Sequence, residues 1–145
     1  MKRLLLAALP ALLAATVAQA TAVVDTAQVQ EAVKRRAIVW DVRGAADFKK
    51  GHIPGAVNIG DAGKVLRNDN TEDFIAVERI EKLLGGAGID PRAEVIVYAS
   101  RGNPYAYFGL YTLQYFGAKK ARVFHDGIDA WRKAGLPVST EETKR

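Results

Sequence analysis

The sequence contains no cysteine among its 145 residues. Without a thiol the chain forms no disulfide, offers no thiolate to a metal and has no sulfur nucleophile. Histidine is also scarce, because only His52 and His125 are present. Two histidines so far apart in the sequence make a poor metal site, so we expect neither a metal nor another cofactor.

After the first twenty residues, the chain has no apolar run long enough to cross a bilayer and no long run of basic residues. The formal net charge is +5, from 21 scattered basic residues and 16 acidic ones. A nucleic-acid-binding surface needs its positive charges clustered, so we expect no nucleic-acid partner.

Residues 1–20 differ from the rest of the chain. A basic "MKR" precedes the apolar run "LLLAALPALLAATV", and "AQA" ends the segment. This order is typical of a secretory signal peptide, and it predicts cleavage after Ala20, an exported domain over residues 21–145 and no membrane span after cleavage. The bacterial periplasm is the expected compartment. The alternative is a retained membrane anchor, for which the run is short and is interrupted by Pro10.

The remaining sequence alternates between helical and strand patterns, and 49% of all residues are apolar, enough for one domain with a core. We expect helices at 25–35, 76–86, 105–116 and 127–135, strands at 37–42, 57–59, 94–99 and 121–125, and an irregular segment at 60–74. In the second helix, Val77, Ile80 and Leu84 should face inward and Gly85–Gly86 should end the helix. This order favours a single α/β domain with an open, mainly parallel sheet flanked by helices on both faces.

Ligands of such sheets bind beyond the carboxyl ends of the strands, so the loop "ASRGN" between the third strand and its helix is the main candidate. Its free backbone N–H groups, the helix dipole and one arginine could together hold an anion. The anion-binding residues would be Ser100, Arg101, Gly102 and Asn103. The alternative is an ordinary connection with a solvated arginine.

Three segments resemble the rhodanese-like sulfurtransferase domains: "DVRGAADFKKGHIPGAVNI", "VIVYASRGN" and "VFHDGIDAWRKAGLPV". They occur in the family's order and spacing. The resemblance implies the same open parallel sheet, and an active-site loop whose first residue is a cysteine that carries sulfur as a persulfide. In this chain that position is Ala99.

The missing cysteine favours an exported, non-catalytic binding or docking module in sulfur-related metabolism. Two enzymatic alternatives stay open. The natural chain could carry cysteine at position 99 and be a sulfurtransferase, or Ser100 could act as the nucleophile of a hydrolase with His125 as its base. A generic ester and phosphoester screen would distinguish the second.

Other residues of the motifs have simpler interpretations. Asp41, Arg43 and His52 are expected to support the structure, with an anion-facing role as the alternative for Arg43. Tyr107, Tyr111 and Tyr115 recur every four residues and therefore share one face of a helix, which makes them a possible partner surface.

The segment "LQYFGAKKARVF" resembles the non-catalytic half of two-domain sulfurtransferases, which docks to a catalytic half. The expected partners are thus a protein of the cell envelope and a small oxyanion such as thiosulfate or sulfate.

Overall fold

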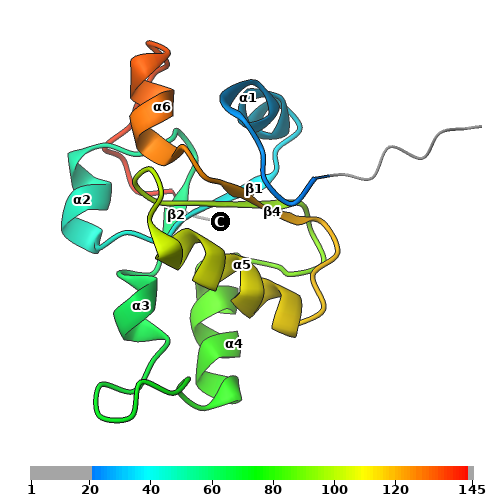
Figure 1. Ribbon diagram of the computed structural model, residues 1–145, viewed down its shortest axis with the longest axis vertical. Helices are drawn as coiled ribbons and strands as arrows, with labels where there is room; N and C mark the ends of the chain where they lie inside the picture. The colour runs from blue at the N-terminus through cyan, green and yellow to red at the C-terminus, as the bar shows by residue number, and fades with distance from the viewer. Residues whose placement is uncertain (1–20, 144–145) are drawn as a thin grey trace, which may run out of the picture.

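The computed structural model describes residues 21–143, so the predicted signal peptide at 1–20 lies outside the described residues. Four strands form one parallel sheet in the order β2-β1-β3-β4 (Figure 1). The strands are β1 (Ile38–Asp41), β2 (Val57–Asn58), β3 (Val95–Tyr98) and β4 (Ala121–Phe124). All eight residues of β1 and β3 are buried, because these central strands are covered on both faces.

Six helices connect and cover the strands in the described part of the chain. They are α1 (Thr26–Lys34), α2 (Ala45–Lys50), α3 (Ala62–Val65), α4 (Val77–Gly86), α5 (Pro104–Tyr115) and α6 (Gly127–Lys133). Asp25 starts α1 with a capping box. The Asp25 side chain accepts from the Gln28 N–H, and the Gln28 side chain accepts from the Asp25 N–H.

The helices divide between the two faces of the sheet, which confirms the predicted architecture. On one face, Trp40 and Val97 pack with Leu110 and Leu113 of α5 and with apolar residues of α3 and α4. On the other face, the core contains α1, α2 and α6 and includes Trp131. Because neighbouring residues of a strand point to opposite faces, each central strand contributes to both cores.

The segment 60–74 is not wholly irregular, because residues Ala62–Val65 form the short helix α3. The Asp61 side chain caps this helix by accepting from the Gly63 N–H, and Ala62 and Leu66 are fully buried. Burying these two apolar residues holds the turn against the sheet. Four residues are too few to show a helical period, which is why the pattern did not indicate it.

Two details of α4 also differ from the expectation. Val77 is 38% exposed, because it is the first helical residue, and the core is reached only by Ile80 and Leu84 further along. Gly85 and Gly86 lie inside the helix, and the chain turns away at Gly88, which has φ = 71°. The left-handed conformation that ends a helix thus falls two residues later than predicted.

The parallel order separates the connections between the two ends of the sheet. Loops that lead from strand to helix lie at the carboxyl ends of the strands, and loops that lead from helix to strand lie at the amino ends.

None of the helices within residues 21–143 has the length and apolar character needed to cross a membrane.

Gly109 and Gly85 provide a matched test of packing. A β-carbon at Gly109 would lie 2.8 Å from Val97 Cγ1 and 3.1 Å from Val42 Cγ1, whereas a β-carbon at Gly85 would meet no atom within 4 Å. We expect Gly109→Ala to lower the free energy of unfolding by about 1–3 kcal/mol through overpacking. Gly85→Ala should raise it by about 0.5 kcal/mol through helix propensity. Urea denaturation measures both, and a Gly109→Ala protein as stable as the wild type would contradict the close packing of α5.

Candidate functional site

The loop that follows β3 begins at a buried residue. Ala99 is 1% exposed, and its methyl group belongs to the core on the α5 side of the sheet. The carbonyl of Ala99 accepts from the Ile128 N–H at 3.0 Å, which holds the start of α6 against the loop. Gly127 makes this contact possible, because a β-carbon there would lie 2.1 Å from the Ala99 oxygen. The loop is therefore fixed by the chain segment that follows β4.

Three backbone N–H groups of the loop have partners within the chain. The Arg101 N–H donates to Asp129 Oδ2 at 2.7 Å, and the Gly102 N–H donates to the His125 carbonyl at 3.0 Å. The Asn103 N–H donates to the Ser100 carbonyl at 3.1 Å. Three of the donors expected to face an anion are thus occupied by groups of the protein itself.

The side chain of Arg101 also pairs within the protein. Its Nε lies 3.2 Å from Asp126 Oδ1, and both side chains are largely exposed. Arg101, Asp126, Asp129 and Lys133 line a small hollow of about 260 Å³ beside the loop. Two acidic and two basic side chains balance there, so the loop does not present the surplus positive charge that its single arginine suggested.

The helix end of the loop is built for starting α5. Asn103 Oδ1 accepts from the Tyr105 N–H at 2.9 Å, and Pro104 occupies the first helical position, where a missing N–H costs nothing. Gly102 adopts φ = 69°, which lets the backbone turn into the helix.

His125 lies beside the loop, as expected, but its ring is directed to α5. His125 Nδ1 is 2.8 Å from the Tyr107 hydroxyl, and the two ring centroids are 5.9 Å apart. Across residues 21–143 the structure shows no hydrogen bond between Ser100 and His125. The Ser100 hydrolase therefore stays a prediction. The contact with Tyr107 uses Nδ1 of the His125 ring.

Asp41 and Arg43 form a buried ion pair at the end of β1. Arg43 Nη2 lies 2.6 Å from Asp41 Oδ2 and also donates to the Gly51 carbonyl at 2.9 Å. Burial alone would lower the pKa of Arg43, but the hydrogen bond and charge of Asp41 outweigh it and raise the pKa. With its donors directed to Asp41 and Gly51, Arg43 supports the turn before β2.

His52 is fully buried and both ring nitrogens have carbonyl partners. Nδ1 is 2.8 Å from the Phe48 oxygen and Nε2 is 2.9 Å from the Glu141 oxygen, while the ring stacks on Phe48 at 3.6 Å. The backbone of His52 pairs in an antiparallel bridge with Ser139. This ring therefore links α2 to the C-terminal segment.

The three tyrosines of α5 differ in exposure. Tyr107 is half-buried through its bond to His125, whereas Tyr111 and Tyr115 are 62% and 72% exposed. Large aromatic side chains with this exposure form a surface that a partner could cover.

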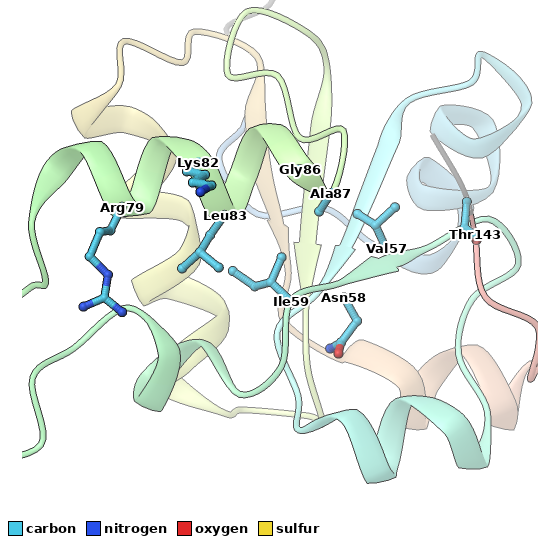
Figure 2. Close-up of a pocket in the computed structure, with 9 residues that line it drawn as sticks. All are labelled: Val57, Asn58, Ile59, Arg79, Lys82, Leu83, Gly86, Ala87 and Thr143. Atoms are coloured by element: carbon cyan, nitrogen blue, oxygen red, sulfur yellow. The ribbon is translucent and has the colours of Figure 1, made fainter.

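A larger hollow of about 680 Å³ lies elsewhere, between the outer edge of β2 and α4. Figure 2 shows Leu83 and Ile59 directed toward each other across it, with Thr143 at its rim. None of the candidate loop residues lines this hollow.

Residues 21–143 also contain no group of three or more histidine, aspartate or glutamate side chains that could hold a metal.

Sequence reasoning missed Asp126, Asp129 and the Tyr107–His125 pair. Asp126 and Asp129 begin α6, where carboxylates commonly interact favourably with the helix dipole, so the pattern alone gave them an ordinary explanation. Only the three-dimensional contact with the loop, 28 residues earlier in the chain, reveals their second role.

Comparison with known proteins gives a consistent family. A family model described as "Rhodanese-like domain" matches residues 25–134. A thiosulfate sulfurtransferase of Corynebacterium glutamicum is 40% identical over 81 residues, which cover 56% of this chain and 27% of that protein. The sulfur carrier protein TtuD of Thermus thermophilus is 32% identical over 94 residues, which cover 65% of this chain and 33% of that protein. The chain therefore spans about a third of the length of these curated relatives.

Solved structures share the fold. SseA from Escherichia coli, a 3-mercaptopyruvate sulfotransferase, aligns with a TM-score of 0.75 at 20% identity, covering 87% of this chain and 53% of that one. A rhodanese-like domain from Anabaena aligns with a TM-score of 0.58 at 18% identity, covering 83% of this chain and 80% of that one.

Tyr98, the last residue of β3, should make the stability of the domain sensitive to alkali. Its hydroxyl accepts from the Ile53 N–H at 3.0 Å, and burial, followed by the negative charge of Asp41, raises its pKa well above the ordinary value. In the unfolded chain a tyrosine loses its proton near pH 10, before the folded one does. Above that pH the unfolded state binds fewer protons, so this residue's contribution to the free energy of unfolding falls by up to about 1.4 kcal/mol per pH unit.

Tyr98→Phe should therefore be less stable at pH 7 by about 1–3 kcal/mol, because the Ile53 N–H loses its acceptor. It should also lose less stability than the wild type as the pH rises from about 9 to 11. Urea denaturation over this range measures the difference. Tyr115→Phe, at an exposed position, is the control and should follow the wild type. If Tyr98→Phe and the wild type lost the same free energy of unfolding between pH 9 and 11, Tyr98 would not be the source of the alkaline sensitivity.

Proposed function

The chain belongs to the rhodanese-like domain family, and on that premise we propose that it is an exported, non-catalytic docking module in sulfur-related metabolism. The observation that carries the proposal is the methyl group of Ala99 at the nucleophile position, in a chain with no cysteine. With no thiol in the protein, a persulfide has no atom on which to form.

The geometry of the loop supports the same conclusion. A sulfur-transferring loop has to leave its N–H groups open to an incoming oxyanion, whereas here Asp129 and the His125 carbonyl occupy two of them. Asp126 pairs with the side chain of Arg101. In this chain the polar groups of Arg101 therefore bind the start of α6.

The partner we propose is a cysteine-bearing, rhodanese-like domain on a separate polypeptide. The curated relatives are about three times as long as the segment that matches this chain, so further chain accompanies this unit in them. The docking surface we propose is the middle of the exposed side of α5, with Tyr111 as its anchor. Tyrosine combines a large apolar area with a hydroxyl that tolerates water, which suits a surface that is free part of the time.

Tyr111→Ser should weaken this association about tenfold, the usual effect of truncating an aromatic anchor in an interface. The test is a pull-down of the protein from its own cell envelope, identification of the captured proteins by mass spectrometry, and titration of the purified partner. Val138→Ser, which removes another exposed apolar side chain, should leave the association unchanged. Capture of a protein without a cysteine-bearing, rhodanese-like domain, or equal weakening by both substitutions, would refute the proposal.

A small oxyanion such as sulfate or thiosulfate is the second ligand we propose, and it would compete with Asp129 for the Arg101 N–H. In the wild type we expect binding weaker than about 1 mM, because the carboxylate must first be displaced. Asp129→Ala should strengthen binding by on the order of tenfold, since it removes a competing charge-assisted hydrogen bond.

An NMR titration that follows the amides of residues 100–103 measures this effect. Adding Arg101→Ala to Asp129→Ala removes the guanidinium charge but keeps the freed N–H, so it should reduce the gain without abolishing it, and added salt should weaken binding. Asp47→Ala is the control, because Asp47 is an exposed carboxylate away from the loop whose ion pair within residues 21–143 is with Lys50. If the Arg101 amide does not respond in Asp129→Ala, the loop is only a connection between β3 and α5.

A further inference from the structure

Five basic residues gather at the amino ends of the strands. The turn between α1 and β1, the turn between α5 and β4, and the first part of β4 carry five basic residues: Arg35, Arg36, Lys119, Lys120 and Arg122. We refer to these five residues as the basic end. Because the helix-to-strand connections of a parallel sheet meet at the amino ends of the strands, the fold itself brings these segments together.

Glu94 joins the segments of the basic end and is its acidic member. It lies 2.9 Å from Arg35 Nη2 and also pairs with Arg122. Burial alone would raise the pKa of Glu94, but the hydrogen bonds and charges of Arg35 and Arg122 outweigh it and lower the pKa. One carboxylate is thus shared between two guanidinium groups, so these three residues still carry a surplus positive charge.

The other three basic residues are exposed. Arg36, Lys119 and Lys120 form no ion pair with any of residues 21–143. Two acidic residues near these turns, Glu31 and Asp90, are engaged with Lys34 and Arg92, respectively. The basic end therefore keeps most of its positive charge.

The N-terminal part of the chain joins the domain at the same place. Val23 pairs in parallel with Val123 of β4, and the Val123 N–H donates to the Ala22 carbonyl at 2.8 Å. Because this pairing is parallel, Thr21 and Ala22 lie at the amino end of β4. Ala22 lines a hollow of about 490 Å³ together with Lys119, Lys120 and Arg122.

Residues 4–17, which precede this junction, are an apolar run of the kind that enters a membrane as a signal peptide or as an anchor. The basic end is therefore the part of the domain from which the chain continues toward this apolar run. Tyr115, the last residue of α5 and 72% exposed, lies four residues before Lys119. An exposed tyrosine beside lysines is the combination that favours the headgroup region of a bilayer.

We propose that the basic end is a binding surface for anionic phospholipid headgroups, which orients the domain with the α5–β4 turn on the membrane and the loop at residues 99–103 away from it. Each lysine near an anionic surface contributes a binding energy that is screened by salt. The loop lies a strand length away, about 13 Å for four residues, so it stays accessible to a partner in solution.

The test measures the partition of the full chain, made by cell-free synthesis, between water and phosphatidylcholine vesicles with or without phosphatidylglycerol. The ratio of the two partition coefficients cancels the contribution of the apolar run, which is the same in every variant. Lys119→Ala with Lys120→Ala should lower this ratio on the order of tenfold at low salt, and the wild-type ratio should approach one at high salt.

Lys49→Ala with Lys50→Ala is the matched control, because it removes another pair of adjacent, exposed lysines, on α2, which lies on the opposite side of the view in Figure 1. It should change the ratio less than twofold. Three results would overturn the proposal: a wild-type ratio near one at low salt, an equal loss in both double variants, or tighter binding of duplex DNA than of phosphatidylglycerol vesicles with the same dependence on Lys119 and Lys120. The last result would assign the surface to nucleic acid.

Discussion

The buried ion pair of Asp41 and Arg43 fixes the arrangement of the carboxyl ends of three strands. Arg43 binds the carboxylate on β1 and the Gly51 carbonyl in the turn before β2, and its guanidinium carbon lies 5.9 Å from the ring centre of Tyr98 on β3. Asn58 of β2 donates to the carbonyls of both Asp41 and Arg43. Removing one member of a buried pair typically costs about 3–5 kcal/mol, because the other charge is left uncompensated. The loop at residues 99–103 thus begins from a rigid base that does not require the cysteine.

Contacts with the start of α6 hold the loop in place. Gly127 lets the start of α6 approach the Ala99 carbonyl, and this approach places Asp129 on the Arg101 N–H. The Asp129 carboxylate and the His125 carbonyl therefore hold two N–H groups of the loop. An anion could reach the Arg101 N–H only by displacing Asp129.

The sequence predicted the elements whose signal is long and repeated, and missed those that depend on distant contacts. The strand at 94–99 and the helix at 105–116 were found because apolar residues and a helix start follow each other without interruption. The helix α3 was not predicted, because only two buried residues define it. The direction of the His125 ring toward Tyr107 could not be inferred, since it depends on how β4 and α5 pack side by side.

The two ends of a parallel sheet give this small domain two separate surfaces, and α5 connects them. Its 12 residues run about 18 Å, from Pro104 at the end of the loop to Tyr115 beside the α5–β4 turn. Tyr107 is tied to the loop end by His125, while Tyr115 is exposed at the basic end. Leu110 and Leu113 hold the inner side of α5 against the sheet. The outer side of the helix is therefore open to one contact at each end. A membrane contact at the basic end and a protein contact in the middle of α5, at Tyr111, are therefore compatible on one helix.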